Sequence, residues 1–279
     1  MGKILDGKGL SDKILNKLAD SILENNYSPT LAVILVGNNP ASEVYVSVKE
    51  KACNKIGIKS VVYKFDENTE ESVILNQIRE LNENKDIDGI LVQLPLPKHI
   101  DKFKVIETIS PQKDVDGFTL YNFGRVALGL KPHCYPCTPK GILTLLDEYK
   151  IQIEGKNVVV VGRSDIVGKP LANIFLKRNA TVTICHSKTK NLAEITNRAD
   201  ILVAAIGCPK FITAEMVKDG AILIDVGISR VDGKLSGDID FDEVFDKVAY
   251  ITPVPKGIGP MTIASLMENT LELYKSHNH

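Results

Sequence analysis

The stretch Asn157-Val158-Val159-Val160-Val161-Gly162-Arg163-Ser164-Asp165-Ile166-Val167-Gly168 decides the fold class of this chain. Its first five residues are typical of a buried parallel strand, and a glycine turn follows at once. Glycines let backbone N–H groups approach an anion, and a helix predicted over Lys169–Arg178 would present its N-terminus to negative charge. The stretch therefore predicts a phosphate-binding strand-turn-helix unit. Because its spacing departs from Gly-x-Gly-x-x-Gly, a simple turn with a solvated Arg163 is the alternative.

Strands and helices alternate on both sides of this turn. Strands are predicted at Thr30–Val36, Ile58–Phe65, Gly89–Leu94, Asn157–Val161, Thr181–Cys185, Ile201–Ala205 and Ala221–Val226. Further helices are predicted around Tyr45 and Lys49, over Glu70–Asn84, Gly141–Lys150 and Leu192–Asn197, and from Pro260 to about Lys275. Such alternation is typical of α/β layers with right-handed crossovers. The proline-rich segment from Pro95 to Pro139 separates the two series and is interpreted as site loops and a connection.

We therefore predict an α/β fold of two domains with a cleft between them. A chain of 279 residues is long enough for two such domains.

Composition and charge exclude several classes of protein. Hydrophobic content of 44% and charged content of 25% are typical of a soluble globular protein. The formal net charge of −1 argues against nucleic acid or a membrane surface as partner. No apolar run approaches the ~18 residues of a membrane span. Met1-Gly2-Lys3 leads into a helix pattern marked by Ile14, Leu18 and Ile22 rather than a secretory segment, so we expect a cytoplasmic protein.

The cysteines suggest reduced, structural thiols. An odd number does not suit a disulfide framework, and the five are Cys53, Cys134, Cys137, Cys185 and Cys208. Cys134-Tyr135-Pro136-Cys137 has redox-motif spacing, but it lies in a proline-rich connector rather than after the first strand of a small domain. A zinc site is disfavoured because no second Cys or His pair has ligand spacing, and His133 with the two cysteines makes three potential ligands without a fourth. No metal is expected.

The second strand after the glycine turn favours one dinucleotide over the other. An NAD site needs Asp or Glu at the end of this strand to hold the ribose hydroxyls. Here the strand ends Cys185-His186-Ser187-Lys188, without a carboxylate. Arg163, Ser187 and Lys188 would instead surround a 2′-phosphate. The predicted cofactor is NADP.

A phenol and an amine share one helix face in the first half of the chain. Tyr45 and Lys49 are four residues apart, so both side chains can point into one cavity. A lysine amine transfers protons at neutral pH only if its pKa falls from about 10.4 by roughly 3 units, which an exposed helix cannot provide. The pair therefore predicts a cleft.

Three further polar residues lie at a strand end or in a loop later in the first half of the chain. Gln93 ends the strand Gly89–Leu94, where ligands of parallel sheets bind, and its alternative role is that of a loop-capping amide. Asp114 and Asp116 lie two residues apart in a glycine loop. A calcium loop would need additional oxygen ligands, which are absent. We expect one carboxylate to face an amidine-like ligand and the other to make turn contacts.

Taken together, these segments resemble the bifunctional methylenetetrahydrofolate dehydrogenase/methenyltetrahydrofolate cyclohydrolase family. The matching segments run in order along nearly the whole chain: Ser42-x-x-Tyr45-x-x-x-Lys49, Gly89–Leu96, Lys113–Gly117, Pro136–Gly141, Val160–Ser164 with Val167-Gly168, Cys185-His186-Ser187, Asp225–Ile228 and Thr252–Thr262. One departure is visible, because the family's closing loop usually reads Pro-Gly-Gly and Lys256 follows Pro255 here. A positive φ at Lys256 would strain that loop.

The resemblance implies an enzyme that oxidises 5,10-methylenetetrahydrofolate to 5,10-methenyltetrahydrofolate with NADP and hydrolyses this product to 10-formyltetrahydrofolate. It implies a catalytic group in which Lys49 transfers protons, Gln93 hydrogen-bonds Lys49 and Asp116 binds the pterin. It implies substrate contacts from Tyr45, Val92, Leu94 and Pro260, and cofactor contacts from Gly162, Arg163, Ser164, Val167, Gly168, Ser187 and Ile228. The resemblance also implies an N-terminal α/β catalytic domain over residues 1–138, joined by a returning C-terminal helix at 256–279, and a Rossmann-type NADP-binding domain over residues 139–255. Family members are usually homodimers that pair through the second domain.

Other functions remain as alternatives. The Tyr-x-x-x-Lys spacing also occurs in short-chain dehydrogenases, but their glycine turn precedes the pair, whereas here it follows by more than a hundred residues, so this class is rejected. Shikimate-type dehydrogenases share the order of domains. A dehydrogenase that lacks the hydrolytic step is a third possibility. A nucleotide-sensing Rossmann module would leave Lys49, Gln93 and Asp116 without a role.

Overall fold

The computed structural model describes residues 2–277 and divides them into two compact units. The three-strand unit comprises Asp12–Arg125, Leu130–Cys137 and the chain from Ile263 on. The six-strand unit comprises the chain up to Ser11, Val126–Gly129 and Thr138–Thr262. The predicted domain boundaries at residues 138 and 255 remain predictions. Within residues 2–277, no helix has the length and apolar character needed to cross a membrane.

The three-strand unit contains a short parallel sheet with the order β3-β2-β4. Its strands are β2 (Thr30–Val36), β3 (Lys59–Phe65) and β4 (Gly89–Val92). Every residue of β2 and β4 is buried, as expected for parallel strands that are covered on both faces. The strand predicted at Thr30–Val36 is confirmed, and the third strand ends two residues earlier than predicted, so that Gln93 follows β4 directly.

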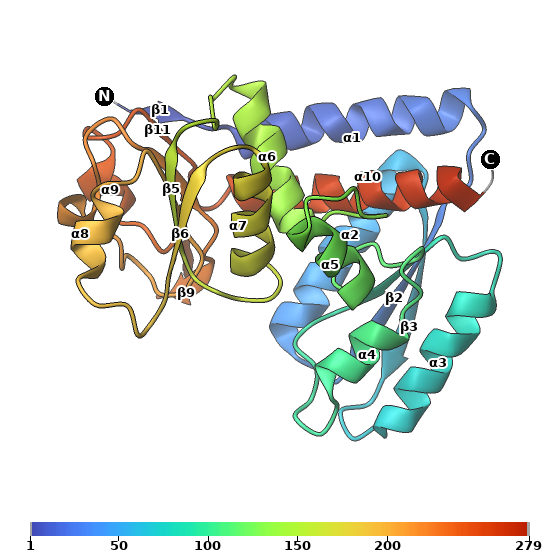
Figure 1. Ribbon diagram of the computed structural model, residues 1–279. Coiled ribbons are helices and arrows are strands. Elements are labelled where there is room, and N and C mark those ends of the chain that lie inside the picture. The colour runs from blue at the N-terminus through green and yellow to red at the C-terminus, as the bar shows by residue number, and fades with distance from the viewer. Residues whose placement is uncertain (1, 278–279) are drawn as a thin grey trace. The chain divides into compact units, whose positions relative to one another are not determined.

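Helices cover both faces of this sheet (Figure 1). On one face, alternate residues of β2 pack with α2 (Pro40–Ile56) and with parts of α1 (Gly7–Glu24) and α10 (Ile258–His277). On the other face, the intervening residues pack with α3 (Glu71–Glu83) and α4 (Lys102–Thr108). The sequence pattern predicted α1, α2, α3 and α10. It missed α4 and α5 (Leu120–Ala127), because both are short helices within the proline-rich segment.

Helix α2 is defined by clear end signals. The Asn39 side chain accepts hydrogen bonds from the N–H groups of Ala41 and Ser42, and Pro40 occupies the first turn. Gly57 ends the helix with φ 86°. These signals set the bounds of the helix that carries Tyr45 and Lys49.

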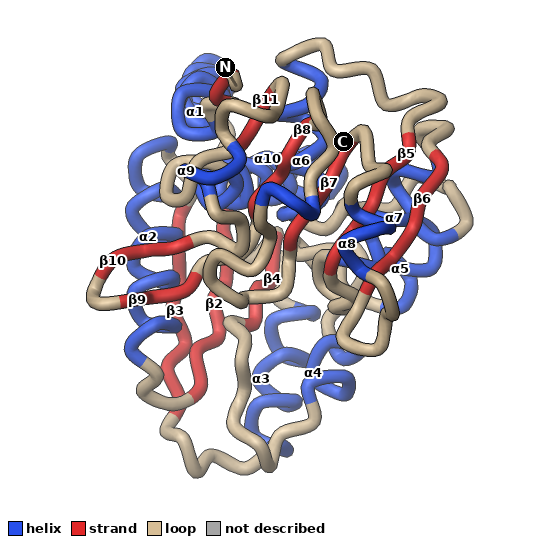
Figure 2. The backbone as a smooth tube through the Cα atoms, turned by 90° about the vertical axis from the view of Figure 1, so that its left-hand side faces the viewer, coloured by secondary structure: helices blue, strands red, loops and turns tan. Residues whose placement is uncertain are grey.

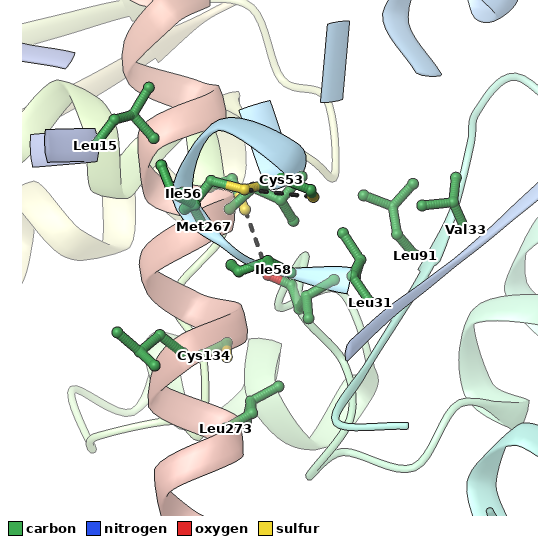
Figure 3. Packing of buried hydrophobic residues seen from close by; sticks show 14 of the residues in the cluster. Leu15, Leu31, Val33, Cys53, Ile56, Ile58, Leu91, Cys134, Met267 and Leu273 are labelled. Atoms are coloured by element: carbon green, nitrogen blue, oxygen red, sulfur yellow. Dashed lines mark hydrogen bonds between the residues drawn. The ribbon is translucent and has the colours of Figure 1, made fainter. Parts of the chain in front are cut away.

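Met267 of α10 anchors the core beneath α2. The Cys53 thiol lies 3.6 Å from the Met267 sulfur, and both residues are fully buried (Figure 3). Burial is the main cause that raises the pKa of the Cys53 thiol to about 12, with a further contribution from Glu50. A thiol in this environment packs as a small apolar group and is inert.

The six-strand unit contains a parallel sheet with the order β1-β11-β8-β7-β5-β6 (Figure 2). Its strands are β1 (Lys3–Ile4), β5 (Asn157–Val161), β6 (Thr181–Cys185), β7 (Ile201–Ala204), β8 (Ile222–Asp225) and β11 (Tyr250–Ile251). Strands β5, β6, β7 and β8 confirm the predicted alternation. The sequence did not indicate β1, since two residues carry no periodicity, and the chain enters this strand before its first helix.

Short helices and one hairpin complete the six-strand unit. They are α6 (Cys137–Glu148), α7 (Gly168–Lys177), α8 (Leu192–Thr196), the 3₁₀ turn η1 (Ala214–Met216), α9 (Phe241–Val244), and the antiparallel pair β9 (Ser229–Val231) and β10 (Lys234–Ser236). Helix α6 begins at Cys137, four residues earlier than predicted. Residues of α8 and α9 pack on one face of the sheet, and α7 follows the glycine turn and packs along β6.

Candidate active site

A hydrogen bond joins Lys49 and Gln93 in the three-strand unit. The Lys49 Nζ donates to Gln93 Oε1 at 3.0 Å, and the amide nitrogen of Gln93 donates to the carbonyl oxygen of Leu94 at 2.6 Å. The second bond sets the orientation of the amide, because a carbonyl can only accept. Gln93 therefore both caps its loop and presents an oxygen to the amine. Only 9% of Gln93 is exposed, whereas Lys49 is half-buried.

Tyr45 lies one helical turn before Lys49 and is 46% exposed. Its ring is therefore accessible to a flat ligand. Its neighbour on the helix, Val46, is buried in the core. The predicted role of Tyr45 as a substrate contact remains a prediction.

Asp114 is buried and organises its own loop. Its carboxylate accepts hydrogen bonds from the N–H groups of Gly117 and Thr119, the hydroxyl of Thr119 and the amide of Asn122, at 2.8–2.9 Å. These are the turn contacts that the sequence assigned to one of the two carboxylates.

Asp116 has a different environment. The Cys137 thiol lies 3.7 Å from its Oδ1. Burial raises the pKa of Asp116 to about 6, and the negative charge of Asp114 adds to this effect. The ammonium group of Lys49 and the Cys137 thiol act in the opposite direction. The amine, the amide and this carboxyl group therefore belong to one electrostatic environment.

Cys137 is a neighbour of Asp116 that the sequence analysis did not identify as a site residue. Its thiol also donates to the carbonyl oxygen of Val115 at 3.3 Å, and the Asn269 amide lies 3.5 Å from its sulfur. The segment Pro136–Gly141 was recognised only as part of a family pattern. Its contact with Asp116 arises from the fold, since 21 residues separate the two side chains in sequence.

A small cavity lies beside Asp114 and Asp116. Its volume of about 10 Å³ is roughly the room needed by one water molecule. Its lining residues are Ile90, Val92, Leu94, Ile106, Ile109, Asp114, Asp116 and Phe118. Val92 and Leu94 were predicted to contact substrate, and the structure places both in this lining with Asp116.

The glycine turn lies at the carboxyl edge of the six-stranded sheet. Gly162 has φ 130°, and a Cβ atom at this position would clash with the carbonyl oxygen of Ala205. A Cβ atom on Gly168 would clash with the carbonyl oxygen of Gly162. Both positions therefore require glycine, and the backbone can closely approach a bound phosphate. Such a cradle fits a dinucleotide.

Ser164 and Val167 shape the start of α7. The Ser164 hydroxyl accepts hydrogen bonds from the N–H groups of Val167 and Gly168 at 3.2 and 3.3 Å. Ser164 therefore stabilises the turn by accepting hydrogen bonds from its backbone. The sequence did not predict this structural role. Direct cofactor contacts from Ser164 and Val167 remain predictions.

The register of β5 and β6 brings Arg163 and Ser187 to the same edge. Val161 pairs with Cys185, and the Gly162 N–H donates to the Cys185 carbonyl at 2.9 Å. Arg163 and Ser187 each lie two residues beyond this pair, and both are exposed, as is Lys188. Ile228 follows β8 and is 41% exposed. The basic groups predicted for a 2′-phosphate thus follow neighbouring strands.

The comparisons with known proteins agree with this geometry. The description "Tetrahydrofolate dehydrogenase/cyclohydrolase, catalytic domain" matches residues 5–116, and "Tetrahydrofolate dehydrogenase/cyclohydrolase, NAD(P)-binding domain" matches residues 136–278. The chain belongs to the tetrahydrofolate dehydrogenase/cyclohydrolase family.

Individual relatives cover almost the entire chain. The "Bifunctional protein FolD" of Thermodesulfovibrio yellowstonii is 56% identical over 273 residues, which are 96% of this chain and 95% of the relative. A crystal structure of the bifunctional FolD dehydrogenase/cyclohydrolase from Campylobacter jejuni is 49% identical, with a TM-score of 0.97 and 99% of each chain covered. The dehydrogenase-cyclohydrolase of Trypanosoma brucei, solved with NADP and an inhibitor, is 36% identical, with a TM-score of 0.94 and 99% and 98% of the two chains covered.

The departure from the usual loop of this family has a structural consequence. Lys256 has φ 84°, so it occupies the left-handed region that the family's glycine would adopt without steric strain. Its carbonyl oxygen accepts a hydrogen bond from the Lys8 N–H at 2.9 Å. The neighbouring Pro260 lies in the first turn of α10, and its carbonyl accepts from the Ser11 hydroxyl at 2.9 Å. Pro260 belongs to the six-strand unit, and its contact with substrate remains a prediction.

The cysteines of this chain, all within residues 2–277, form no disulfides. All five cysteines are free, and Cys208 alone among them is exposed. Within residues 2–277, no group of three or more His, Cys, Asp or Glu side chains could hold a metal ion.

Proposed function

We propose that this chain oxidises 5,10-methylenetetrahydrofolate to 5,10-methenyltetrahydrofolate with NADP and then hydrolyses the product to 10-formyltetrahydrofolate. The observation that carries the proposal is the 3.0 Å hydrogen bond between Lys49 and Gln93 in the environment of Asp116. Membership of the dehydrogenase/cyclohydrolase family supports both steps.

The oxidation depends chiefly on alignment. NADP, when bound, accepts a hydride from the one-carbon bridge of the folate. The folate is left as an amidinium cation that is stabilised by resonance. The protein must hold the donor carbon in line, so the fixed backbone at Gly162 and Gly168 matters more here than acid–base chemistry.

The hydrolysis requires proton transfers. Water adds to the one-carbon centre and loses a proton, and a ring nitrogen takes up a proton as its bond to that carbon breaks. We assign these transfers to the Lys49 amine, which is the basic group beside Gln93. The Gln93 oxygen holds the amine in place, since its amide is itself fixed on Leu94.

Asp116 and Tyr45 are assigned to folate binding. A carboxyl group can accept two adjacent N–H donors of the pterin ring. The Asp116 carboxyl suits this role because Asp114, and not Asp116, makes the turn contacts. The exposed ring of Tyr45 would stack on the folate aromatic system.

NADP is preferred over NAD in this proposal. Arg163, Ser187 and Lys188 are exposed and follow the paired ends of β5 and β6. A relative, the Trypanosoma brucei enzyme, was solved with NADP. We further infer a cytoplasmic homodimer in which the six-strand units pair, as the family resemblance implied.

Two absorbances test the proposal in one reaction. The protein is mixed with 5,10-methylenetetrahydrofolate and NADP, and the NADPH and methenyl signals are followed at separate wavelengths. We expect NADPH to form without accumulation of the methenyl compound. Accumulation would indicate a dehydrogenase that lacks the hydrolytic step, and absence of NADPH would favour a nucleotide-sensing module.

A further inference from the structure

Asp238 lies between β10 and α9 in the six-strand unit, and it is completely buried. Its Oδ2 accepts hydrogen bonds from the N–H groups of Ile206 and Gly207 at 2.7 and 3.1 Å. Its Oδ1 accepts a hydrogen bond from the Cys208 N–H at 2.7 Å. One side chain therefore accepts from three successive N–H groups of a loop about thirty residues away in sequence.

This loop follows β7 at the carboxyl edge of the sheet. Ala205, its first residue, donates to the Val161 carbonyl at 2.8 Å and closely contacts Gly162. The loop is therefore packed against the glycine turn. Dinucleotides bind at this edge in sheets of this type. Although the loop backbone is bound to a buried carboxylate, the Ile206 side chain is 37% exposed and available to a ligand.

Asp225 in turn holds the backbone of Asp238. Its two carboxylate oxygens accept from the N–H groups of Asp238 and Ile239 at 2.9 and 3.0 Å. The Asp225 N–H donates to the Thr252 hydroxyl at 2.7 Å. The end of β8 is thus connected through Asp238 to the loop after β7.

Two glycines make room for this arrangement. A Cβ atom on Gly227 would clash with the Asp238 carboxylate, and a Cβ atom on Gly237 would clash with the Asp225 carboxylate. Burying a carboxylate is costly unless its oxygens are satisfied by donors. The loop N–H groups supply these donors, which is why the loop and Asp238 depend on each other.

We propose that Asp238 is a positioning residue for the NADP coenzyme, which acts by fixing the backbone of Ile206–Cys208 beside the glycine turn before the coenzyme binds. This inference rests on the proposed function, because it assumes that NADP binds at this edge. Asp238 does not need to touch the coenzyme. It acts through the loop backbone, whose three N–H groups donate hydrogen bonds to the Asp238 carboxylate.

The variant Asp238→Asn tests the proposal. An amide keeps the shape but turns one acceptor into a donor, so at least one loop N–H faces another donor. We expect the KM for NADP to rise at least tenfold. Hydrolysis of added 5,10-methenyltetrahydrofolate, assayed without NADP, should remain within twofold of the wild type. A purely structural role would lower both activities together and would overturn the proposal.

Asp200→Asn provides the matched control. Asp200 also accepts a backbone hydrogen bond, from Asn157 at 2.9 Å, but it precedes β7 at the opposite edge of the same sheet. Both activities should stay within twofold in this variant. If the wild type forms no NADPH, the proposed function fails. If the wild type forms NADPH and Asp238→Asn leaves the KM for NADP unchanged, only the positioning role fails.

A measurement on the wild type covers the case in which Asp238→Asn does not fold. Hydrogen exchange of the Ile206, Gly207 and Cys208 amides is followed with and without NADP. We expect all three amides to be protected in the absence of NADP, because Asp238 already accepts from them. Exchange at the rate of an open loop until NADP is added would contradict the proposal.

Discussion

The Lys49 amine donates to an amide oxygen of Gln93 whose orientation is set by a second hydrogen bond to Leu94. A helix and a strand end, 44 residues apart in sequence, thereby fix one amine in the three-strand unit. The proposed hydrolytic step depends on this relationship.

Gln93→Leu keeps the volume of the side chain and removes its oxygen. Lys49 then loses its acceptor and is free to change rotamer. We expect methenyltetrahydrofolate hydrolysis to fall at least tenfold, while the affinity for NADP stays within twofold. Steady-state rates and NADP titration measure the two effects. Gln112→Leu, at an exposed position, is the control and should leave both values unchanged.

Asp116→Asn should alter the pH dependence of stability. Because the pKa of Asp116 is raised in the folded protein from 3.8 to about 6, its ionisation disfavours the folded state. Relative to the variant, the wild type therefore loses stability as pH rises through about 6 and shows no loss below about 4. The difference at pH 8 should approach, but not exceed, about 3 kcal/mol.

Denaturant unfolding of wild type and Asp116→Asn at pH 4 and pH 8 measures this difference. The variant should be the more stable protein at pH 8 and equal to the wild type at pH 4. A variant that is less stable at pH 8 would show that the environment favours the charged carboxylate.

Lys256→Gly should stabilise the protein. A left-handed conformation costs a non-glycine residue roughly 1–2 kcal/mol, and glycine loses about 0.4–1 kcal/mol through the greater entropy of its unfolded chain. The expected net gain is about 0.5–1 kcal/mol. Thermal or denaturant unfolding measures it. Lys256→Ala is the control, since it removes the charge but keeps the Cβ atom, and an equal gain in this variant would rule out backbone strain as the cause.

Arg163→Ala should raise the KM for NADP at least tenfold and leave the KM for NAD unchanged, because only NADP carries the 2′-phosphate. Arg198→Ala is the control. Arg198 is exposed, lies just after α8 and forms an ion pair with Glu194 of that helix. The KM values of wild type and variants for NADP and for NAD measure the effect. Equal losses with NADP and NAD would mean that Arg163 contacts a group common to the two.

The sequence predicted the parts of the fold whose patterns are local. β2 is recognisable because its seven residues form a short, almost entirely apolar run, and the end signals of α2, Asn39 and Gly57, directly flank the helix. By contrast, β1 and β11 are two residues each. They become strands only because the fold pairs β1 with β11 and β11 with β8. Nothing in a two-residue segment distinguishes it from a loop.

The site was predictable to a similar extent. The separation of Asp114 from Asp116 followed from the chemistry of a carboxylate in a turn, and the strain at Lys256 followed from the glycine expected there. Cys137 and Asp238 could not be found in this way, because each acts on a segment more than twenty residues away. Their roles depend on the packed structure and leave no local pattern.

The hydrolysis rate of Lys49→Met tests the central claim most directly. With 5,10-methenyltetrahydrofolate as substrate and no coenzyme, we predict a loss of at least about 100-fold, as is usual when a proton-transfer group is removed. NADP affinity should persist, and Lys51→Met, an exposed lysine on the same helix, should behave as the wild type. Full hydrolytic turnover by Lys49→Met would contradict the assignment of proton transfer to this amine.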